Sequence, residues 1–406
     1  MPPHDLAAVR ARFPALAGTQ AYLDGPGGSQ VPDVVGAAMT GYLYGSNANL
    51  GGVFPSSVAS ESLMDEARRA AADFVGGSPN EIAFGPNMST LNFLLAHAVA
   101  RTLEPGDEII TTVLDHDANI SPWRQVADDH GLYVRTVPVR DPDLTIDLAA
   151  LEAALSSRTR IVAFTLASNA VGTVSAARAI ADLAHEAGAL AWADAVHYAP
   201  HRRIDVRHLG VDVLLCSPYK FFGPHLGLAW ARKQLLEGWP ADRVRPADET
   251  PPGHRFELGT QSHEAIAGFV AAVEYLGSLG GGLDRVGRLD SAFGRIQQHE
   301  EELARRFLIG LSDVPGCRLY GIGDPERADE RTPTFCVTVD GHTPRQVAAR
   351  LAERGVNVWD GNYYAPELMS HLGLEGHGGG VRIGFLHYTS PDEVDRALTA
   401  LRLTSL

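Results

Sequence analysis

The chain has 406 residues, of which 45% are hydrophobic, 34 are basic and 49 are acidic, so its net charge is −15. This length exceeds what one hydrophobic core usually supports and predicts two packed domains. The negative charge excludes the basic surface that binding to nucleic acids or anionic membranes requires, and three scattered cysteines exclude a disulfide framework or a thiolate metal site.

The N-terminal segment 1–14 has no apolar core, and nowhere do roughly eighteen apolar residues run together. We therefore expect no export signal and no membrane span. Together with the few cysteines, this pattern predicts a protein of the reducing cytoplasm.

Residues 60–236 alternate short apolar runs with amphipathic stretches rich in Ala and Leu. The clearest predicted strands are Glu108–Val113, Tyr133–Val137, Arg160–Leu166, Leu190–Ala193 and Val211–Cys216. Helices are predicted over Leu148–Leu155 and Ala176–Ala187, and Gly188 ends the second at a cap position. The alternation predicts an α/β fold in which helices flank a mostly parallel sheet on both faces.

A polar, proline-containing loop over 243–259 precedes a long helical pattern over His263–Leu279 and the glycine triplet 280–282. The chain beyond the triplet predicts helices over 290–311 and Pro344–Arg354, and strands over Thr334–Val339 and Val381–Phe385. We therefore expect a large domain of residues 18–282, and a smaller α+β domain formed by residues 1–17 and 283–406.

One lysine, Lys220, follows the predicted strand Val211–Cys216 within the aromatic segment 219–222. Burial disfavours the charged form of a lysine and lowers its pKa, and an unprotonated amine is what a Schiff base with an aldehyde cofactor requires. The alternative is a surface lysine whose stem covers an aromatic patch. The segment by itself leaves both readings open.

Other predicted strands end in groups that suit a cofactor. Asp194 follows the strand Leu190–Ala193, and a carboxylate there can keep a pyridine nitrogen protonated, which makes the ring an electron sink. Ser89 and Thr90 precede an apolar helix that begins near Leu91, and the free N–H groups of such a helix N-terminus suit a phosphate.

Two more strand ends supply a ring and an amide. His116 follows the strand that ends near Leu114, where its imidazole can stack on a pyridine, and Asn169 can donate to a ring hydroxyl. Each of these residues alone is more often a turn or capping residue than a ligand. Five strand ends that all carry such groups are what an open α/β binding crevice predicts.

Taken together, these segments resemble the class V aminotransferases of the fold type I enzymes dependent on pyridoxal 5′-phosphate (PLP), most closely the branch of group II cysteine desulfurases and selenocysteine lyases. The likeness covers nearly the whole chain, in segments 21–24, 84–96, 115–123, 168–173, 194–197, 217–223, 255–260 and 381–388. It implies a PLP enzyme that acts on an amino acid.

The resemblance implies that Lys220 carries the cofactor as a Schiff base and removes the substrate α-proton. It implies that Asp194 pairs with the pyridine nitrogen, that His116 stacks on the ring, and that Asn169 and His197 lie near the ring hydroxyl.

The resemblance implies that the cofactor phosphate is bound by the backbone of Met88 and by Ser89 and Ser217 of the same subunit, and by Thr260 of the neighbouring subunit. A homodimer is therefore implied.

For the substrate, the resemblance implies that Arg382 binds the α-carboxylate, a role that a bidentate guanidinium suits. The alternative for Arg382 is a surface ion pair. Asn49 and Gly28 belong to segments implied to line the pocket for the substrate side chain.

Three positions depart from the group II desulfurases. Tyr219 stands where they usually have His, and His197 stands where they usually have Gln. In segment 359–366, Tyr364 stands at about the place of the sulfur-accepting cysteine, and a phenol cannot carry a persulfide. The three cysteines themselves, Cys216, Cys317 and Cys336, have the sequence context of structural residues.

These features predict a desulfurase-like lyase that expels a β-substituent such as sulfur, with Lys220, His116 and Tyr364 as catalytic residues and no metal. A transaminase, decarboxylase or epimerase of the same family is the alternative, since one cofactor serves all these reactions, and a non-catalytic scaffold is a third reading. No strand precedes a G-x-G-x-x-G motif, and His197 and His201 lack a third metal ligand at a convincing spacing.

Overall fold

The computed structural model describes residues 4–405, and a seven-stranded sheet forms its centre. The order across the sheet is β2-β10-β9-β8-β7-β3-β4. The strands are β2 (Ile82–Gly85), β3 (Glu108–Thr112), β4 (Tyr133–Val137), β7 (Thr159–Thr165), β8 (Leu190–Asp194), β9 (Val213–Cys216) and β10 (Gly227–Ala231). The predicted mostly parallel sheet is confirmed, and only β10 pairs antiparallel to both of its neighbours.

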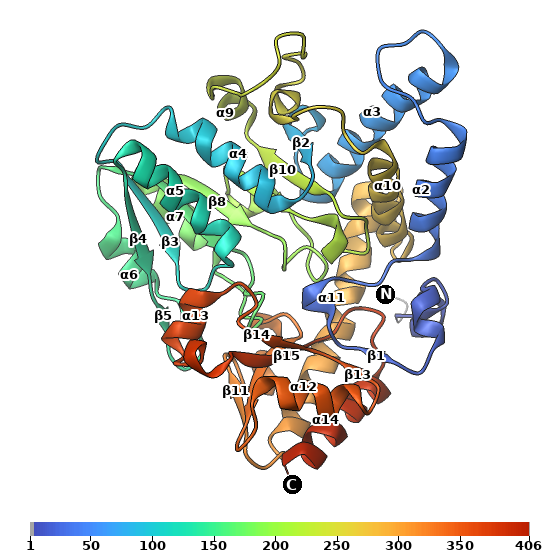
Figure 1. Cartoon of the computed structure of the whole chain (residues 1–406), viewed down its shortest axis with the longest axis vertical. Coiled ribbons are helices and arrows are strands. Elements are labelled where there is room, and N and C mark those ends of the chain that lie inside the picture. Colours follow the sequence, from blue (N-terminus) through green and yellow to red (C-terminus); the bar gives the residue numbers. More distant parts are fainter. Residues whose placement is uncertain (1–3, 406) are drawn as a thin grey trace.

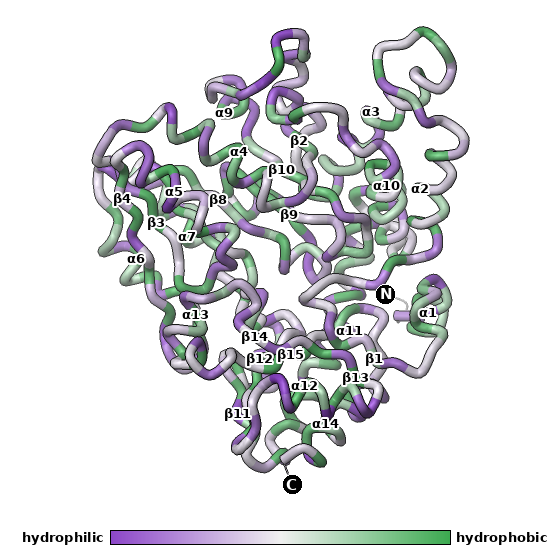
Figure 2. The backbone as a smooth tube through the Cα atoms, viewed as in Figure 1, coloured by the Kyte–Doolittle hydropathy of each residue, from purple (hydrophilic) through white to green (hydrophobic). Residues whose placement is uncertain are grey.

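Helices cover both faces of this sheet because successive strand residues point to opposite sides. Ile110 and Leu214 pack with α3, α7 and α10 on one face, whereas Ile109 and Val213 pack with α4 and α5 on the other. Figure 2 shows the apolar stretches gathered on the central strands. The helices of this part are α2 (Asp33–Gly45), α3 (Pro55–Val75), α4 (Met88–Ala100), α5 (Ser121–His130), α6 (Leu148–Ala154), α7 (Ala177–Glu186), α8 (Val206–Leu209), α9 (Lys233–Gly238) and α10 (His263–Ser278).

The C-terminal residues form a smaller antiparallel sheet of order β11-β12-β15-β14, drawn in orange to red in Figure 1. Its strands are β11 (Cys317–Tyr320), β12 (Thr334–Val339), β14 (Trp359–Gly361) and β15 (Gly380–Gly384). The accompanying helices are α12 (Pro344–Ala352), α13 (Pro366–His371) and α14 (Pro391–Ser405). The remaining short elements are α1 (Leu6–Arg10), the parallel pair β1 (Ala21–Tyr22) and β13 (Val356–Asn357), and the pair β5 (Val139–Arg140) and β6 (Thr145–Ile146).

The long helix α11 (Arg285–Leu311) joins the two parts of the molecule. Phe293 and Ile296 belong to the core that lies under the large sheet, whereas Leu303 and Phe307 belong to the core of the smaller sheet. The two predicted domains therefore share one helix, and their exact boundary at 282 stays a prediction.

Two glycines illustrate why the helices end where they do. Gly188 follows α7 with φ of 77°, a left-handed conformation that side chains disfavour. In the turn between α10 and α11, a Cβ on Gly280 would lie 2.0 Å from the carbonyl oxygen of Arg288, so only glycine fits. Within residues 4–405, no helix is long and apolar enough to cross a membrane.

Candidate active site

A cavity of about 1260 Å³ opens at the carboxyl edge of the large sheet. Its walls include the strand-end residues Thr165, Asp194 and Ser217, and segment 359–364 with Arg382 closes it from the smaller sheet. Ten of the predicted site residues line this cavity: Met88, Ser89, His116, Asn169, Asp194, His197, Ser217, Lys220, Tyr364 and Arg382. The structure therefore brings these ten residues together at one cavity, and their individual roles stay predictions.

Three predicted site residues lie elsewhere. Gly28 borders an adjoining cavity of about 560 Å³, which shares Tyr219, His225 and Trp359 with the first. Asn49 and Thr260 are exposed and line neither cavity. Their predicted roles, at the substrate and at the phosphate of the neighbouring subunit, stay predictions.

Lys220 is one of only two lysines in the sequence, and the other, Lys233, is exposed on α9. The Lys220 Nζ donates to the carbonyl oxygen of Pro26 and lies 4.9 Å from the centre of the Tyr219 ring. Burial lowers the pKa of Lys220 to about 7, and the positive charge of Arg382 acts in the same direction. A substantial fraction of this amine is therefore unprotonated near neutral pH, as bonding to an aldehyde requires.

Asp194, the last residue of β8, is buried and accepts a hydrogen bond of 2.8 Å from the backbone N–H of Val196. Burial raises the pKa of Asp194 to about 6. Within residues 4–405, no cation forms an ion pair with this carboxylate. A protonated pyridine nitrogen fits here, because it would supply the charge that the buried carboxylate lacks.

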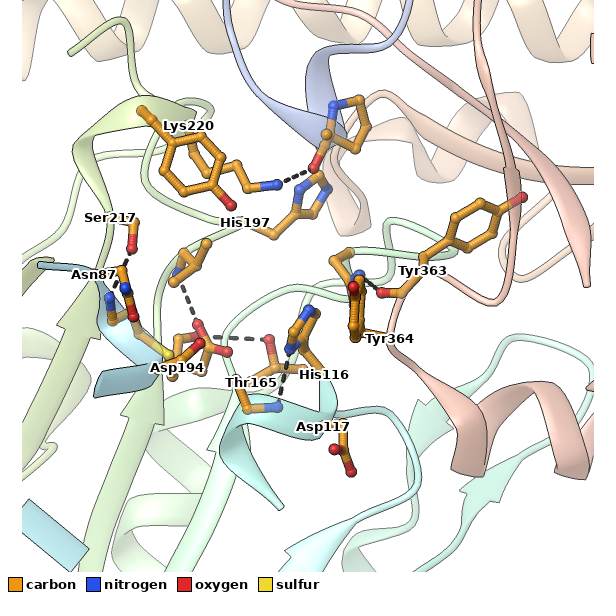
Figure 3. A pocket seen from close by; sticks show the side chains of 18 of the residues that line it. Asn87, His116, Asp117, Thr165, Asp194, His197, Ser217, Lys220, Tyr363 and Tyr364 are labelled. Carbon is orange, nitrogen blue, oxygen red and sulfur yellow. Dashed lines mark hydrogen bonds between the residues drawn. The ribbon is translucent and has the colours of Figure 1, made fainter. Parts of the chain in front are cut away.

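His116 lies across the cavity from Lys220, as Figure 3 shows. Its Nδ1 accepts from the backbone N–H of Ala118 at 3.0 Å, which fixes the ring at the start of a 3-10 turn. Burial lowers the pKa of His116 to about 4, so the ring is flat and neutral. Its other neighbour is the ring of Tyr364, stacked at a centroid distance of 5.5 Å.

The start of α4 differs from the sequence-based expectation. The helix begins at Met88 rather than near Leu91, and Asn87 caps it by accepting from the N–H of Thr90 at 2.8 Å. The Met88 N–H is already donated to the Ser217 hydroxyl oxygen at 3.0 Å. Among the described residues, no group accepts from the N–H of Ser89, so this N–H and the two serine hydroxyls form a donor set suited to a phosphate.

Arg382 is buried without a carboxylate partner among residues 4–405, so the alternative of a surface ion pair is wrong. It donates to the carbonyl oxygen of Asn169 at 2.9 Å, its guanidinium lies 4.4 Å from the Tyr363 ring centre, and its Nε has no partner in the described chain. Burial lowers its pKa to about 10. A free buried guanidinium in a cavity suits a substrate carboxylate.

Asn169 is held by the loop that carries Tyr363. Its Nδ2 donates to the carbonyl oxygen of Tyr363 at 2.8 Å, while its buried Oδ1 has no partner within the described residues. The free groups of this amide are therefore the acceptor Oδ1 and the second N–H of Nδ2, so the predicted donation to the ring hydroxyl stays a prediction.

The loop that carries Tyr363 and Tyr364 holds both residues in left-handed conformations, with φ of 58° and 56°. Such strain persists only where the surroundings fix it, often at functional sites. Here the carbonyl oxygen of Tyr364 accepts from the Asp117 N–H at 2.7 Å, and the Tyr363 hydroxyl donates to the Gly380 carbonyl oxygen. The loop therefore closes over the site in a fixed shape.

Sequence reasoning missed several lining residues. Thr165 ends β7 and could have been found by the strand-end rule that found Asp194. No local pattern distinguished His225, Trp359 or the carbonyl group of Pro26, which reach the site only through the tertiary fold. No cluster of metal-ligating side chains occurs in the described part of the chain.

The family model of class V aminotransferases matches residues 21–397. The chain belongs to this family. It is 33% identical over 97% of its length to the aminotransferase-like protein FGM3 of Gibberella zeae, again over 97% of that protein. It is 31% identical to a cysteine desulfurase of Dickeya dadantii, with 97% of this chain and 95% of the relative covered.

A solved structure of a cysteine desulfurase from Thermococcus onnurineus NA1 has the same fold, with a TM-score of 0.88 and 27% identity over 98% of both chains. This class V member is accordingly a PLP-dependent enzyme with the fold that the sequence predicts. The half-buried Lys220 with its lowered pKa, the unpaired Asp194 and the donor set at Ser89 fit that cofactor.

Proposed function

We propose that the enzyme is a desulfurase-like lyase, which cleaves the bond between the β-carbon of an amino acid and a sulfur substituent without a persulfide cysteine. The observation that carries the proposal is the wall of the cavity, where Tyr363 and Tyr364 occupy the loop nearest His116 and no cysteine is present among the described lining residues. The chain thus offers no thiol to accept sulfur from the substrate.

The environments of the three thiols support this reading. Cys216 and Cys336 are buried within strands, and Cys317 lies in β11, outside the cavity lining. Burial raises the pKa of Cys336 and of Cys317 to about 12, and it also raises the pKa of Cys216. Protonated buried thiols are poor nucleophiles.

In the proposed reaction, bound PLP supplies an aldehyde for the substrate amine and a ring that accepts electrons from the bond broken at the α-carbon. Arg382 binds the substrate α-carboxylate, and Asp194 holds the proton on the ring nitrogen. The Lys220 amine, with its lowered pKa, removes the α-proton. The β-substituent leaves as a thiol, and water converts the remaining three-carbon unit to pyruvate and ammonia.

We assign to the Tyr364 hydroxyl the role of proton donor to the leaving sulfur. Its side chain stacks on His116 at the cavity edge and is 73% exposed, so it can reach a substrate that enters from solvent. A phenol can donate a proton to a departing thiolate.

Incubation of the holoenzyme with L-cysteine, cysteine sulfinate and cysteine S-conjugates tests the proposal. We expect pyruvate in a molar amount equal to the sulfide or thiol released. Accumulation of pyridoxamine phosphate that reverts with a 2-oxo acid would assign the enzyme to the aminotransferases instead. Loss of carbon dioxide or inversion at the α-carbon, without pyruvate, would assign it to the decarboxylases or epimerases.

We also propose that the active unit is a homodimer. Exposed apolar side chains gather at the hairpin between α2 and α3, among them Tyr44, Leu50, Val53 and Phe54. Figure 1 shows this hairpin projecting from the body of the molecule. A patch of this kind is typical of an interface, and Asn49 lies within it. Thr260 is exposed just before α10, and we assign it to the phosphate of the neighbouring subunit's cofactor.

A further inference from the structure

Behind the cofactor cavity lies a buried pair that the proposed reaction does not use. His201 Nδ1 and Glu300 Oε2 are 2.8 Å apart, and both side chains are almost fully buried. The ring of His201 meets the ring of His197 edge to face, at a centroid distance of 5.1 Å. His197 in turn lines the cavity, so the three residues connect the interior of the protein to the active site.

The proton of His197 can be assigned from its contacts. Its Nε2 lies 3.2 Å from Thr332 Oγ1, and the Thr332 hydroxyl donates to the Gly172 carbonyl oxygen at 3.3 Å. Because that hydroxyl proton is engaged, Thr332 Oγ1 accepts and the Nε2 of His197 donates. Within residues 4–405, nothing bonds to the Nδ1, which therefore carries a free lone pair when the ring is neutral.

Glu300 is fixed where the two cores of the molecule meet. It lies on α11 between Ile296 of the large core and Leu303 of the small core. Its second oxygen, Oε1, is buried without a partner in the described chain. A buried carboxylate that leaves one oxygen unsatisfied is costly, which argues that its contact with His201 serves a purpose beyond packing.

We propose that His201 and Glu300 are positioning residues, which together with Thr332 hold the His197 imidazole so that its Nδ1 accepts a hydrogen bond from the bound cofactor or substrate. This inference rests on the proposed active site and adds to it the residues that hold His197 from outside the cavity. Neither residue touches the cavity that holds the chemistry, so both act through His197.

The charges around the pair are consistent with a neutral His197. Burial lowers the pKa of His197 well below its usual value, and His201 acts in the same direction. Burial raises the pKa of Glu300, which His201 opposes. The other charged or titratable groups that face these residues are Arg202 beside His201, Glu301 on α11, Arg331 before β12, His387 and Tyr388 after β15, and Lys220 and Arg382 in the cavity.

The test is the pH titration of the visible absorbance of PLP bound to the holoenzyme, together with the melting temperature. The double variant His201→Phe/Glu300→Met removes the pair but keeps the volume of both side chains, a replacement that buried ion pairs often tolerate. Because the His197 ring then loses the neighbour that holds it, the acidic transition of the absorbance should move by about half a unit or more. Glu302→Gln, on the exposed side of α11, should leave the transition unchanged.

A second pair of variants tests the assigned proton. Thr332→Val keeps the shape of the side chain but removes the acceptor, so it should shift the absorbance transition. Thr332→Ser keeps the hydroxyl and should leave the transition where it is in the wild type. A lower melting temperature with an unmoved transition in both the His201→Phe/Glu300→Met variant and the Thr332→Val variant would overturn the inference, because it would leave these residues a purely structural role. Should the double variant not fold, Glu300→Gln takes its place and is judged by the same transition.

The variant His197→Gln separates this inference from the proposed site. If it leaves the absorbance titration unchanged, His197 does not face the cofactor, and the site assignment fails with the inference. If it shifts the titration while the variants of His201, Glu300 and Thr332 do not, the site stands and only the inference fails.

Discussion

Lys220 and Asp194 show how the loss of solvent prepares two groups for chemistry. The same loss of solvent lowers the pKa of the lysine to about 7 and raises that of the aspartate to about 6. Both pKa shifts favour the uncharged form of the side chain, so without the cofactor the lysine and the aspartate carry less charge than they would in water. A bound ring that carries a proton would stabilise the ionised form of Asp194, because opposite charges in a buried site attract strongly.

The covalent role of Lys220 can be tested with a matched control. We expect Lys220→Arg to lose the visible absorbance of covalently bound cofactor and all turnover, because a guanidinium cannot form the bond to the aldehyde. Lys233→Arg, the only other lysine position, should keep both. Borohydride reduction followed by peptide mass analysis should place the label at Lys220. A label at Lys233 would contradict the assignment.

Asp115 lies just behind the site and makes a separate prediction about pH. It is fully buried, it accepts from Asn119 Nδ2 at 2.8 Å and from the Thr112 hydroxyl, and burial raises its pKa to about 8. Because the folded state binds this proton more tightly than the unfolded state, whose pKa is about 3.9, the contribution of Asp115 to stability falls as pH rises from about 4 to about 8.

The variant Asp115→Asn carries no such charge and can retain both contacts. Its melting temperature relative to that of the wild type should therefore increase between acidic and mildly alkaline pH. Thermal unfolding of the two proteins over that range measures this difference. A difference that stays constant with pH would show that Asp115 is ionised throughout.

At the residue scale, sequence reasoning located residues whose position follows from the end of a strand. Asp194 ends β8, and His116 and Asn169 follow β3 and β7 of the same sheet, so their convergence could be expected. The orientation of Asn169 could not, because it depends on the Tyr363 carbonyl group, almost two hundred residues further along the chain.

Among the elements, the turn between α10 and α11 is sharply constrained. A Cβ on Gly280 would overlap the backbone of Arg288, whereas nothing lies within 4 Å of the Cβ position of Gly281. We expect Gly280→Ala to reduce the free energy of unfolding by roughly 1–3 kcal/mol. Gly281→Ala should change it by less than about 0.5 kcal/mol. Chemical denaturation compares the two, and equal losses would show that the turn can relax.

The predicted elements agree best with the structure where hydrophobic periodicity is strong. The strand Tyr133–Val137 and the strand Thr334–Val339 were predicted to the residue. The start of α4 was misplaced because Asn87, and not a hydroxyl residue, supplies the cap. The antiparallel direction of β10 follows from its pairing partners, which a short apolar run does not reveal.

For the whole molecule, the proposed dimer gives a test of its own. Val53 is fully exposed at the α2–α3 hairpin, and we expect Val53→Asp to convert the dimer to a monomer and to reduce turnover, since burying a charge in an interface is costly. Leu283→Asp places the same charge at another fully exposed apolar position and should leave the dimer intact. Sedimentation of both variants measures the mass, and a dimeric Val53→Asp would place the interface elsewhere.

The shared helix α11 also bears on how this chain can be divided. A fragment that ends at residue 282 would lack Leu289, Phe293 and Ile296, which complete the core under the large sheet. A fragment that begins after α11 would lack Phe307, against which Phe335 packs. Neither half is therefore a module that recombination could transplant alone, and shuffling between relatives is expected to succeed only at exchange points that keep α11 with both of its cores.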